Sequence, residues 1–181
     1  MKTRDYVLCG LFAAILCVSA FITIPLLFTP IPLTMQVLAV AVTAAVLGGK
    51  RGAIAVLIYV LLGCLGLPVF SGMKGGIGIV AGATGGFIWG FIPQAFVAGT
   101  ICDKVFTTGK SGKEIVKVIA ALSLGLCILY SFGVIQLMYV ANMSISKALG
   151  AAVFPFVPFD IFKIAVAAII AVNLRKQIAV I

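Results

Sequence analysis

Long apolar stretches dominate this chain and limit what it can fold into. Of its 181 residues, 64% are hydrophobic and only 9% are charged, whereas about 25% of residues are charged in a typical soluble domain. A helix that crosses a bilayer needs about 20 mostly apolar residues. Six stretches meet or approach this length: residues 6–24, 34–48, 52–67, 76–101, 116–141 and 150–174. We therefore expect an all-α membrane protein with six transmembrane helices in a single bundle, forming one domain over residues 1–181.

The basic residues fall almost entirely on one side of this six-span topology. That side carries ten of the 13 Lys and Arg residues: Lys2, Arg4, Lys50, Arg51, Lys104, Lys110, Lys113, Lys117, Arg175 and Lys176. The links on the opposite side carry only Lys74 and Lys147. Because cytoplasmic loops are rich in Lys and Arg, both termini are predicted to be cytoplasmic. The basic residues behind the net charge of +9 are thus distributed as in a membrane protein, and we expect no nucleic-acid binding.

An acid and a base interrupt the last apolar stretch. Asp160 and Lys163 follow Pro158 within residues 155–163 (PFVPFDIFK). A charged side chain at the centre of a bilayer costs on the order of 2.5–3.5 kcal/mol, so such a residue is a candidate functional residue. Proline suits the first turn of a helix, and residues three apart lie on one helix face. The two residues could bind a ligand. Alternatively, their charges could only neutralise each other and hold helices together.

The residue types around this pair suggest what a ligand would look like. Lys163 can hold an anionic group and Asp160 can accept N–H donors. Aromatic side chains elsewhere in the chain could cover an apolar body; the candidates are Tyr59, Phe70, Phe156 and Phe159. The link over residues 68–75 is short, glycine-rich and capable of acting as a lid. A small amphipathic molecule with a carboxylate and N–H groups fits this set.

Small residues recur at helical spacing in two of the predicted spans. Glycine stands at every fourth position in the fourth span, at Gly78, Gly82, Gly86 and Gly90, which predicts a flat face for a helix or a ligand. The glycine-dense run over residues 82–86 could also loosen that helix. In the first span, the small residues are Gly10, Ala13, Ala14 and Cys17. They could pack within the chain or dock another membrane protein.

The sequence does not support an enzyme. It has no histidine, which removes Ser-His and zinc-hydrolase schemes, and its spans hold one aspartate where an aspartyl dyad needs two. Residues 109–111 (GKS) end like a phosphate-binding loop, but Lys104 stands where that motif requires glycine. The five cysteines form no CxxC pair and read as buried apolar side chains. We expect no catalytic residue, no metal and no cofactor.

In combination, several short motifs resemble the BioY family, the biotin-specific S components of energy-coupling factor (ECF) transporters. The resemblance covers nearly the whole chain. It is carried by residues 31–36 (IPLTMQ), 47–53 (LGGKRGA), 59–63 (YVLLG), 66–72 (GLPVFSG), 75–76 (GG), 84–86 (TGG) and 158–163 (PFDIFK). Two departures stand out: Ala83 replaces the proline that the family usually has before Thr-Gly-Gly, and Met73 and Lys74 replace smaller residues.

The resemblance implies a six-helix biotin-binding subunit of the bacterial cytoplasmic membrane, working with a membrane coupling protein and two ABC-type ATPases. It assigns Asp160 and Lys163 to the polar ends of biotin; we expect the ureido ring at Asp160 and the carboxylate at Lys163, with Lys74 an additional candidate anion contact. Further candidate ligand contacts are Gln36, Thr84, Gly82, Gly85 and Gly86. The small face of the first span would dock the coupling protein. The alternatives are a subunit for another small vitamin or anionic metabolite, and a membrane scaffold with a structural Asp–Lys pair.

Overall fold

Six long helices make up most of the part of the chain that the structure describes, in the number and order that the apolar stretches predict. A computed structural model describes residues 2–26, 29, 31–108 and 113–180. The long helices are α1 (Thr3–Ser19), α2 (Gln36–Leu47), α3 (Gly49–Cys64), α5 (Gly85–Thr108), α6 (Glu114–Ala141) and α8 (Val157–Val180). Two short helices, α4 (Ile77–Ala81) and α7 (Ile145–Ala152), and a two-stranded antiparallel pair, β1 (Thr23–Ile24) and β2 (Leu33–Thr34), complete the described fold. The prediction of an all-α six-helix bundle is confirmed.

Three of these helices are long and apolar enough to cross a membrane by length and composition, within the described residues: 85–106 of α5, 114–141 of α6 and 157–175 of α8. Helix α2 is also apolar but shorter. It lies at the centre of the bundle, in contact with α1, α3, α5 and α8, and most of its side chains are buried. Helices that are apolar all round are typically buried in this way, so the neighbours of α2 shield it from lipid.

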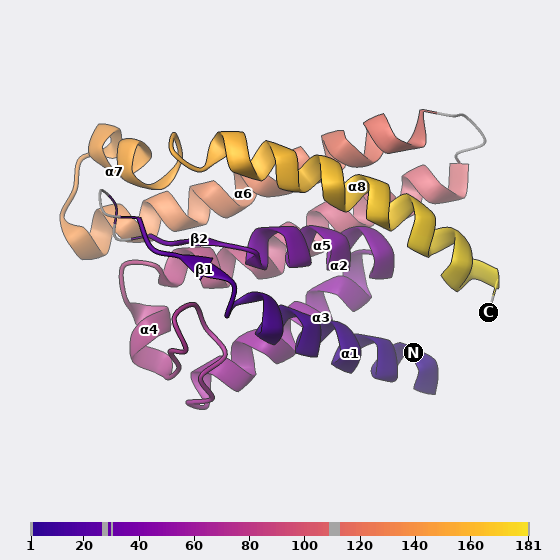
Figure 1. Ribbon diagram of the computed structural model, residues 1–181, viewed down its shortest axis with the longest axis horizontal. Helices are drawn as coiled ribbons and strands as arrows, with labels where there is room; N and C mark the ends of the chain where they lie inside the picture. Colours follow the sequence, from indigo (N-terminus) through magenta and orange to yellow (C-terminus); the bar gives the residue numbers. More distant parts are fainter. Residues whose placement is uncertain (1, 27–28, 30, 109–112, 181) are drawn as a thin grey trace.

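The two ends of the bundle differ in structure. Figure 1 shows both chain termini at one end, which we call the terminal end, and α4, α7 and the β1–β2 pair at the other, which we call the cavity end. At the terminal end, Arg175 on α8 forms an ion pair with Asp103 on α5 and donates to the carbonyl oxygen of Ala45 at 2.8 Å. Asp103 also accepts from the backbone N–H of Gly49 at 3.0 Å. Of the basic residues predicted for this side, Lys110 and the side chain of Lys176 lie outside the described residues.

The fourth predicted span is not one helix, which corrects the expectation of a continuous glycine face. Helix α4 ends at Ala81, and Gly82 takes an extended conformation before α5 begins at Gly85. The side-chain amide of Gln136 on α6 donates to the freed carbonyl oxygens of Val80 and Gly82, at 2.9 and 2.7 Å. An irregular backbone at membrane depth needs such partners. The loosening predicted for residues 82–86 is therefore a complete break.

Two other boundaries differ from the predicted spans. Helix α1 ends at Ser19 rather than near residue 24, because Thr23 and Ile24 pair with Thr34 and Leu33 as β1 and β2. The last span is divided into α7 and α8 by a turn at residues 153–156. Helix α8 begins at Val157, one residue before the proline that suits a first helical turn.

Candidate functional site

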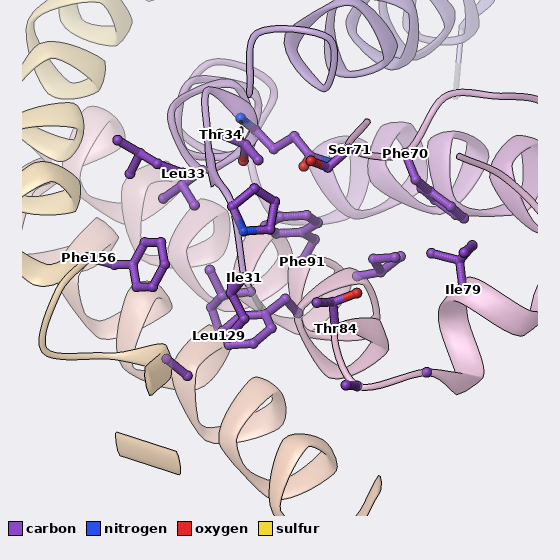
Figure 2. A pocket seen from close by; sticks show the side chains of 18 of the residues that line it. Ile31, Leu33, Thr34, Phe70, Ser71, Ile79, Thr84, Phe91, Leu129 and Phe156 are labelled. Atoms are coloured by element: carbon purple, nitrogen blue, oxygen red, sulfur yellow. Dashed lines mark hydrogen bonds between the residues drawn. The ribbon is translucent and has the colours of Figure 1, made fainter. Parts of the chain in front are cut away.

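A cavity of about 310 Å³ lies inside the cavity end of the bundle. Its walls come from residues 31–37, the segment around residues 70–74, residues 78–91 and parts of α6, α7 and α8. In Figure 2, Phe156 lies on one side of the cavity and Phe70 and Ile79 on the other, with Thr34 and Ser71 above and Leu129 below. Small-molecule sites typically occupy about 300–1,000 Å³ and are mostly apolar with a few polar groups. The volume of this cavity lies near the lower limit of that range, and its wall is likewise mostly apolar.

The buried ion pair of Asp160 and Lys163 forms part of this wall. The Lys163 ammonium lies 2.8 Å from the Asp160 carboxylate, and the two residues are only 7% and 2% exposed. Both are in the first two turns of α8, where their i,i+3 spacing places them on one face. The ammonium also donates to the backbone carbonyl oxygen of Thr34 at 2.8 Å. Two of its three N–H donors therefore have acceptors among the described residues.

Tyr130 on α6 completes the surroundings of Asp160, and the sequence reasoning missed it. Its hydroxyl donates to the second carboxylate oxygen of Asp160 at 2.7 Å, and its side chain lines the cavity. Each oxygen of Asp160 thus accepts a hydrogen bond, one from Lys163 and one from Tyr130. The sequence did contain one indication of this role, because Tyr130 lies within an apolar span. A buried tyrosine hydroxyl usually has a hydrogen-bond partner.

Gln36 lies in the cavity wall and is held from behind by Tyr59. Gln36 is the first residue of α2 and is 5% exposed. Its side-chain amide donates to the hydroxyl of Tyr59 on α3. Tyr59 itself is fully buried and does not line the cavity; its ring packs edge-on against Phe70, with centroids 5.7 Å apart. Tyr59 therefore positions two wall residues, and the structure does not bring it to the ligand space.

The segment from Phe70 to Lys74 forms a tight hairpin at the cavity. The two end residues pair through the backbone, Phe70 N to Lys74 O at 2.9 Å and Lys74 N to Phe70 O at 3.3 Å. The ring of Phe70 is 1% exposed and packs directly on Gly63, where a Cβ would lie 2.1 Å from it. Phe70, Ser71 and Lys74 line the cavity. The predicted lid is thus an anchored hairpin, and its opening stays a prediction.

The break between α4 and α5 supplies another part of the wall. Gly82, Ala83 and Thr84 line the cavity. The predicted contacts Gly85 and Gly86 do not, because they pack against protein: a Cβ on Gly85 would meet the carbonyl oxygen of Val80, and one on Gly86 that of Phe132. Of the predicted aromatic residues, Phe156 lines the cavity, whereas Phe159 is 54% exposed and lies outside its wall.

The residues predicted as a docking face on α1 do not share one exposed surface. Gly10 and Ala14 are exposed. Ala13 is 2% exposed and Cys17 is half-buried, packed against the core. Only part of the predicted face is thus accessible on this chain, and its role in docking stays a prediction.

Comparison with known proteins gives the family. The model of the BioY family matches residues 1–180. The chain belongs to the BioY family. The resemblance found in the sequence motifs is thereby confirmed. BioY relatives are transporters, so membership places this chain among multi-pass membrane transporters rather than enzymes.

Individual BioY relatives match over nearly their full lengths. The chain is 42% identical to a biotin transporter BioY of Thermotoga maritima, over 96% of each chain. It is 43% identical to the corresponding transporter of Rhizobium etli, over 94% of this chain and 92% of that one. A crystal structure of the S-component for biotin from an ECF-type ABC transporter matches with a TM-score of 0.86 and 26% identity, covering 98% of this chain and 95% of that chain.

Proposed function

We propose that this chain binds biotin in the cavity and mediates its uptake across the cytoplasmic membrane as the S component of an ECF-type transporter. The observation that carries the proposal is the buried Asp160–Lys163 pair in a cavity wall, in a chain of the BioY family. A buried ion pair is a poor stabiliser compared with apolar packing. Its presence beside an open space therefore supports a role in binding.

The chemistry of the wall complements the ureido ring of biotin. That ring offers two N–H donors and one carbonyl acceptor. The Asp160 carboxylate has lone pairs beyond the two hydrogen bonds it accepts, so it can receive N–H groups. The remaining N–H donor of Lys163 and the side-chain amide of Gln36 can donate hydrogen bonds to the ureido oxygen. Apolar wall residues surround the rest of the molecule: Phe70, Phe87, Phe91, Leu129 and Phe156.

Uptake requires energy that this chain has no motif to supply, because its sequence holds no complete phosphate-binding loop. In our proposal, a membrane coupling protein and two ABC-type ATPases supply it. The related crystal structure is of an S-component from an ECF-type ABC transporter, which supports this assembly. In this proposal, the exposed residues Gly10 and Ala14 of α1 form part of the surface that contacts the coupling protein, because small residues allow two helices to approach closely.

Biotin binding to the purified full-length chain tests the proposal. We expect the chain, purified in mild detergent, to carry biotin that mass spectrometry identifies after denaturation. Titration calorimetry on ligand-free protein should give one biotin per chain, with no competition from thiamine or riboflavin. A different co-purified vitamin that binds in place of biotin would overturn the assignment of the ligand.

The proposed orientation places both termini in the cytoplasm and the cavity end outside. Support comes from the basic residues, which concentrate in the links and tails of the terminal end. Cysteines introduced one at a time at Ser146 and Lys113, both exposed, in addition to the five native cysteines, can be labelled in intact cells with a membrane-impermeant maleimide. We expect labelling of Ser146→Cys only, with the unsubstituted chain as blank; labelling of Lys113→Cys alone would invert the topology.

A further inference from the structure

We propose that Lys74 is the anion-binding residue of the cavity and holds the carboxylate of the ligand, while Asp160 and Lys163 act as a neutral pair for its polar head. This inference rests on the proposed function and deepens it. It also replaces the sequence-based expectation that Lys163 takes the carboxylate and Lys74 only assists.

The charged residues of the cavity wall do not balance one another. Among the described residues that line the cavity, the charged ones are Lys74, Asp160 and Lys163. Asp160 and Lys163 neutralise each other at 2.8 Å. The wall is therefore left with one positive charge, that of Lys74. A ligand with a single carboxylate would balance this charge, whereas a neutral ligand would not.

A carboxylate at Lys163 would be unfavourable for two reasons. It would place a second negative group beside the Asp160 carboxylate, and two like charges at short range repel each other. It would also have to lose nearly all of its hydration, since the side chains of Asp160 and Lys163 are 3% and 8% exposed. Taking an ion out of water costs several kcal/mol unless excellent geometry compensates. At Lys74, which is exposed, a carboxylate stays partly hydrated.

The acidic residues leave Lys74 available for a ligand. The chain has four of them, and the structure describes all four. Asp5, Asp103 and Glu114 belong to the terminal end, at the start of α1, the end of α5 and the start of α6. Asp160 is thus the acid at the cavity end, and Lys163 pairs with it. No protein carboxylate competes for Lys74 among the ion pairs of the described residues.

The backbone of Lys74 is held in place although its side chain is exposed. Its pairing with Phe70 closes the hairpin, and buried Phe70 anchors that hairpin against Gly63 and Tyr59. The turn between them has positive φ at Gly72 (74°) and Met73 (57°). On the other side, Gly76 N donates to Gly63 O at 2.7 Å. Lys74 therefore leaves the cavity rim from a fixed position, and only its flexible stem adapts to the ligand.

The test compares biotin with biotinamide, in which the carboxylate is replaced by a neutral amide. Calorimetry on the full-length chain in nanodiscs gives the acid-over-amide preference, the ratio of the two dissociation constants. We expect about a tenfold preference for the acid in the unsubstituted chain, the size of one charged hydrogen bond. Lys74→Met, which keeps the length and apolar character of the stem, should reduce the ratio to about one. Lys74→Arg should restore it.

Lys147→Met is the matched control, because Lys147 is an exposed lysine at the same end on α7 and does not line the cavity. Its acid-over-amide preference should equal that of the unsubstituted chain. The preference should also fall as salt rises, because exposed charges are screened. A preference that persists in Lys74→Met, or equal affinities for the two ligands in the unsubstituted chain, would overturn the role of Lys74 while biotin binding stands. Absence of binding to either ligand would instead reject the proposed function.

Discussion

Helix α8 carries an ion pair near each of its ends, and the two pairs have different surroundings. Near the cavity end, the side chains of Asp160 and Lys163 are 3% and 8% exposed and border an open cavity. Near the terminal end, the side chains of Arg175 and Asp103 are 17% and 40% exposed and do not line that cavity. Arg175 donates instead to the carbonyl oxygen of Ala45 and lies over the ring of Phe106, 4.6 Å from its centroid.

The comparison shows that a charge within an apolar helix does not by itself identify a binding site. Both pairs join α8 to other parts of the bundle. Of the two pairs, Asp160 and Lys163 line the cavity and are almost completely buried, whereas Arg175 and Asp103 are partly exposed and do not line it. We therefore expect substitutions near the cavity end to affect ligand binding, and substitutions near the terminal end to affect stability.

The largest effect is expected for Asp160→Asn. This change keeps the shape of the side chain but leaves the buried Lys163 ammonium without its counter-charge. Breaking such a buried pair lowers the stability of the chain by about 3–5 kcal/mol. Because the Asp160→Asn variant also lacks the charged acceptor that the ureido N–H groups would use, and each hydrogen bond to a charged group contributes about 1.5–3 kcal/mol, biotin binding should weaken about 100-fold or more, as measured by calorimetry on detergent-purified protein. The double variant Asp160→Asn with Lys163→Met removes the unpaired charge and should fold but still not bind. Binding within threefold of the unsubstituted chain in both variants would contradict a ligand role for the pair.

A smaller loss is expected for Tyr130→Phe. The substitution removes the hydroxyl that donates to Asp160 at 2.7 Å and leaves the ring in place. Hydrogen bonds to charged groups contribute about 1.5–3 kcal/mol, so binding should weaken about tenfold through a less well oriented carboxylate. Tyr139→Phe on the same helix, at a tyrosine that is 86% exposed, serves as control. An unchanged affinity in Tyr130→Phe would show that the hydrogen bond from Tyr130 to Asp160 does not contribute to biotin binding.

The smallest effect on binding is expected for Arg175→Met. This variant keeps an apolar stem but loses the ion pair with Asp103 and the hydrogen bond to Ala45. We expect the affinity for biotin to stay within twofold. The loss of about 1–2 kcal/mol of stability for a partly exposed charged contact should lower the melting temperature by a few degrees. A large loss of affinity at unchanged stability would contradict the separation between the two ends.

The apolar stretches predicted the helices well, because length and composition decide whether a segment can span a membrane. The Asp160–Lys163 pair could also be predicted, since i,i+3 spacing puts two residues on one face whatever surrounds them. Phe159 could have been rejected on the same ground, because adjacent residues point about 100° apart on a helix. Phe156, one turn before Asp160, lies in the wall with it.

Contacts between distant spans could not be read from the sequence. Tyr130 reaches Asp160 across 30 residues, and Gln136 supports the break at Gly82 across 54; both depend on how α6 packs. Glycine spacing predicted one helix face, but it does not say whether a partner is present to satisfy the freed carbonyl groups of a break. Nor did the sequence show that Gly85 and Gly86 would be covered by protein.

The charge-swapped chain, with Asp160→Lys and Lys163→Asp together, gives the most direct test of the site. Its biotin affinity is measured by calorimetry in nanodiscs, alongside its melting temperature. If the two charges serve a ligand, the swap preserves an ion pair but places each charge at the wrong atom, so binding should fall at least 100-fold while the chain remains folded. Affinity equal to that of the unsubstituted chain would mean that the pair only holds helices together, and the proposed site would be wrong.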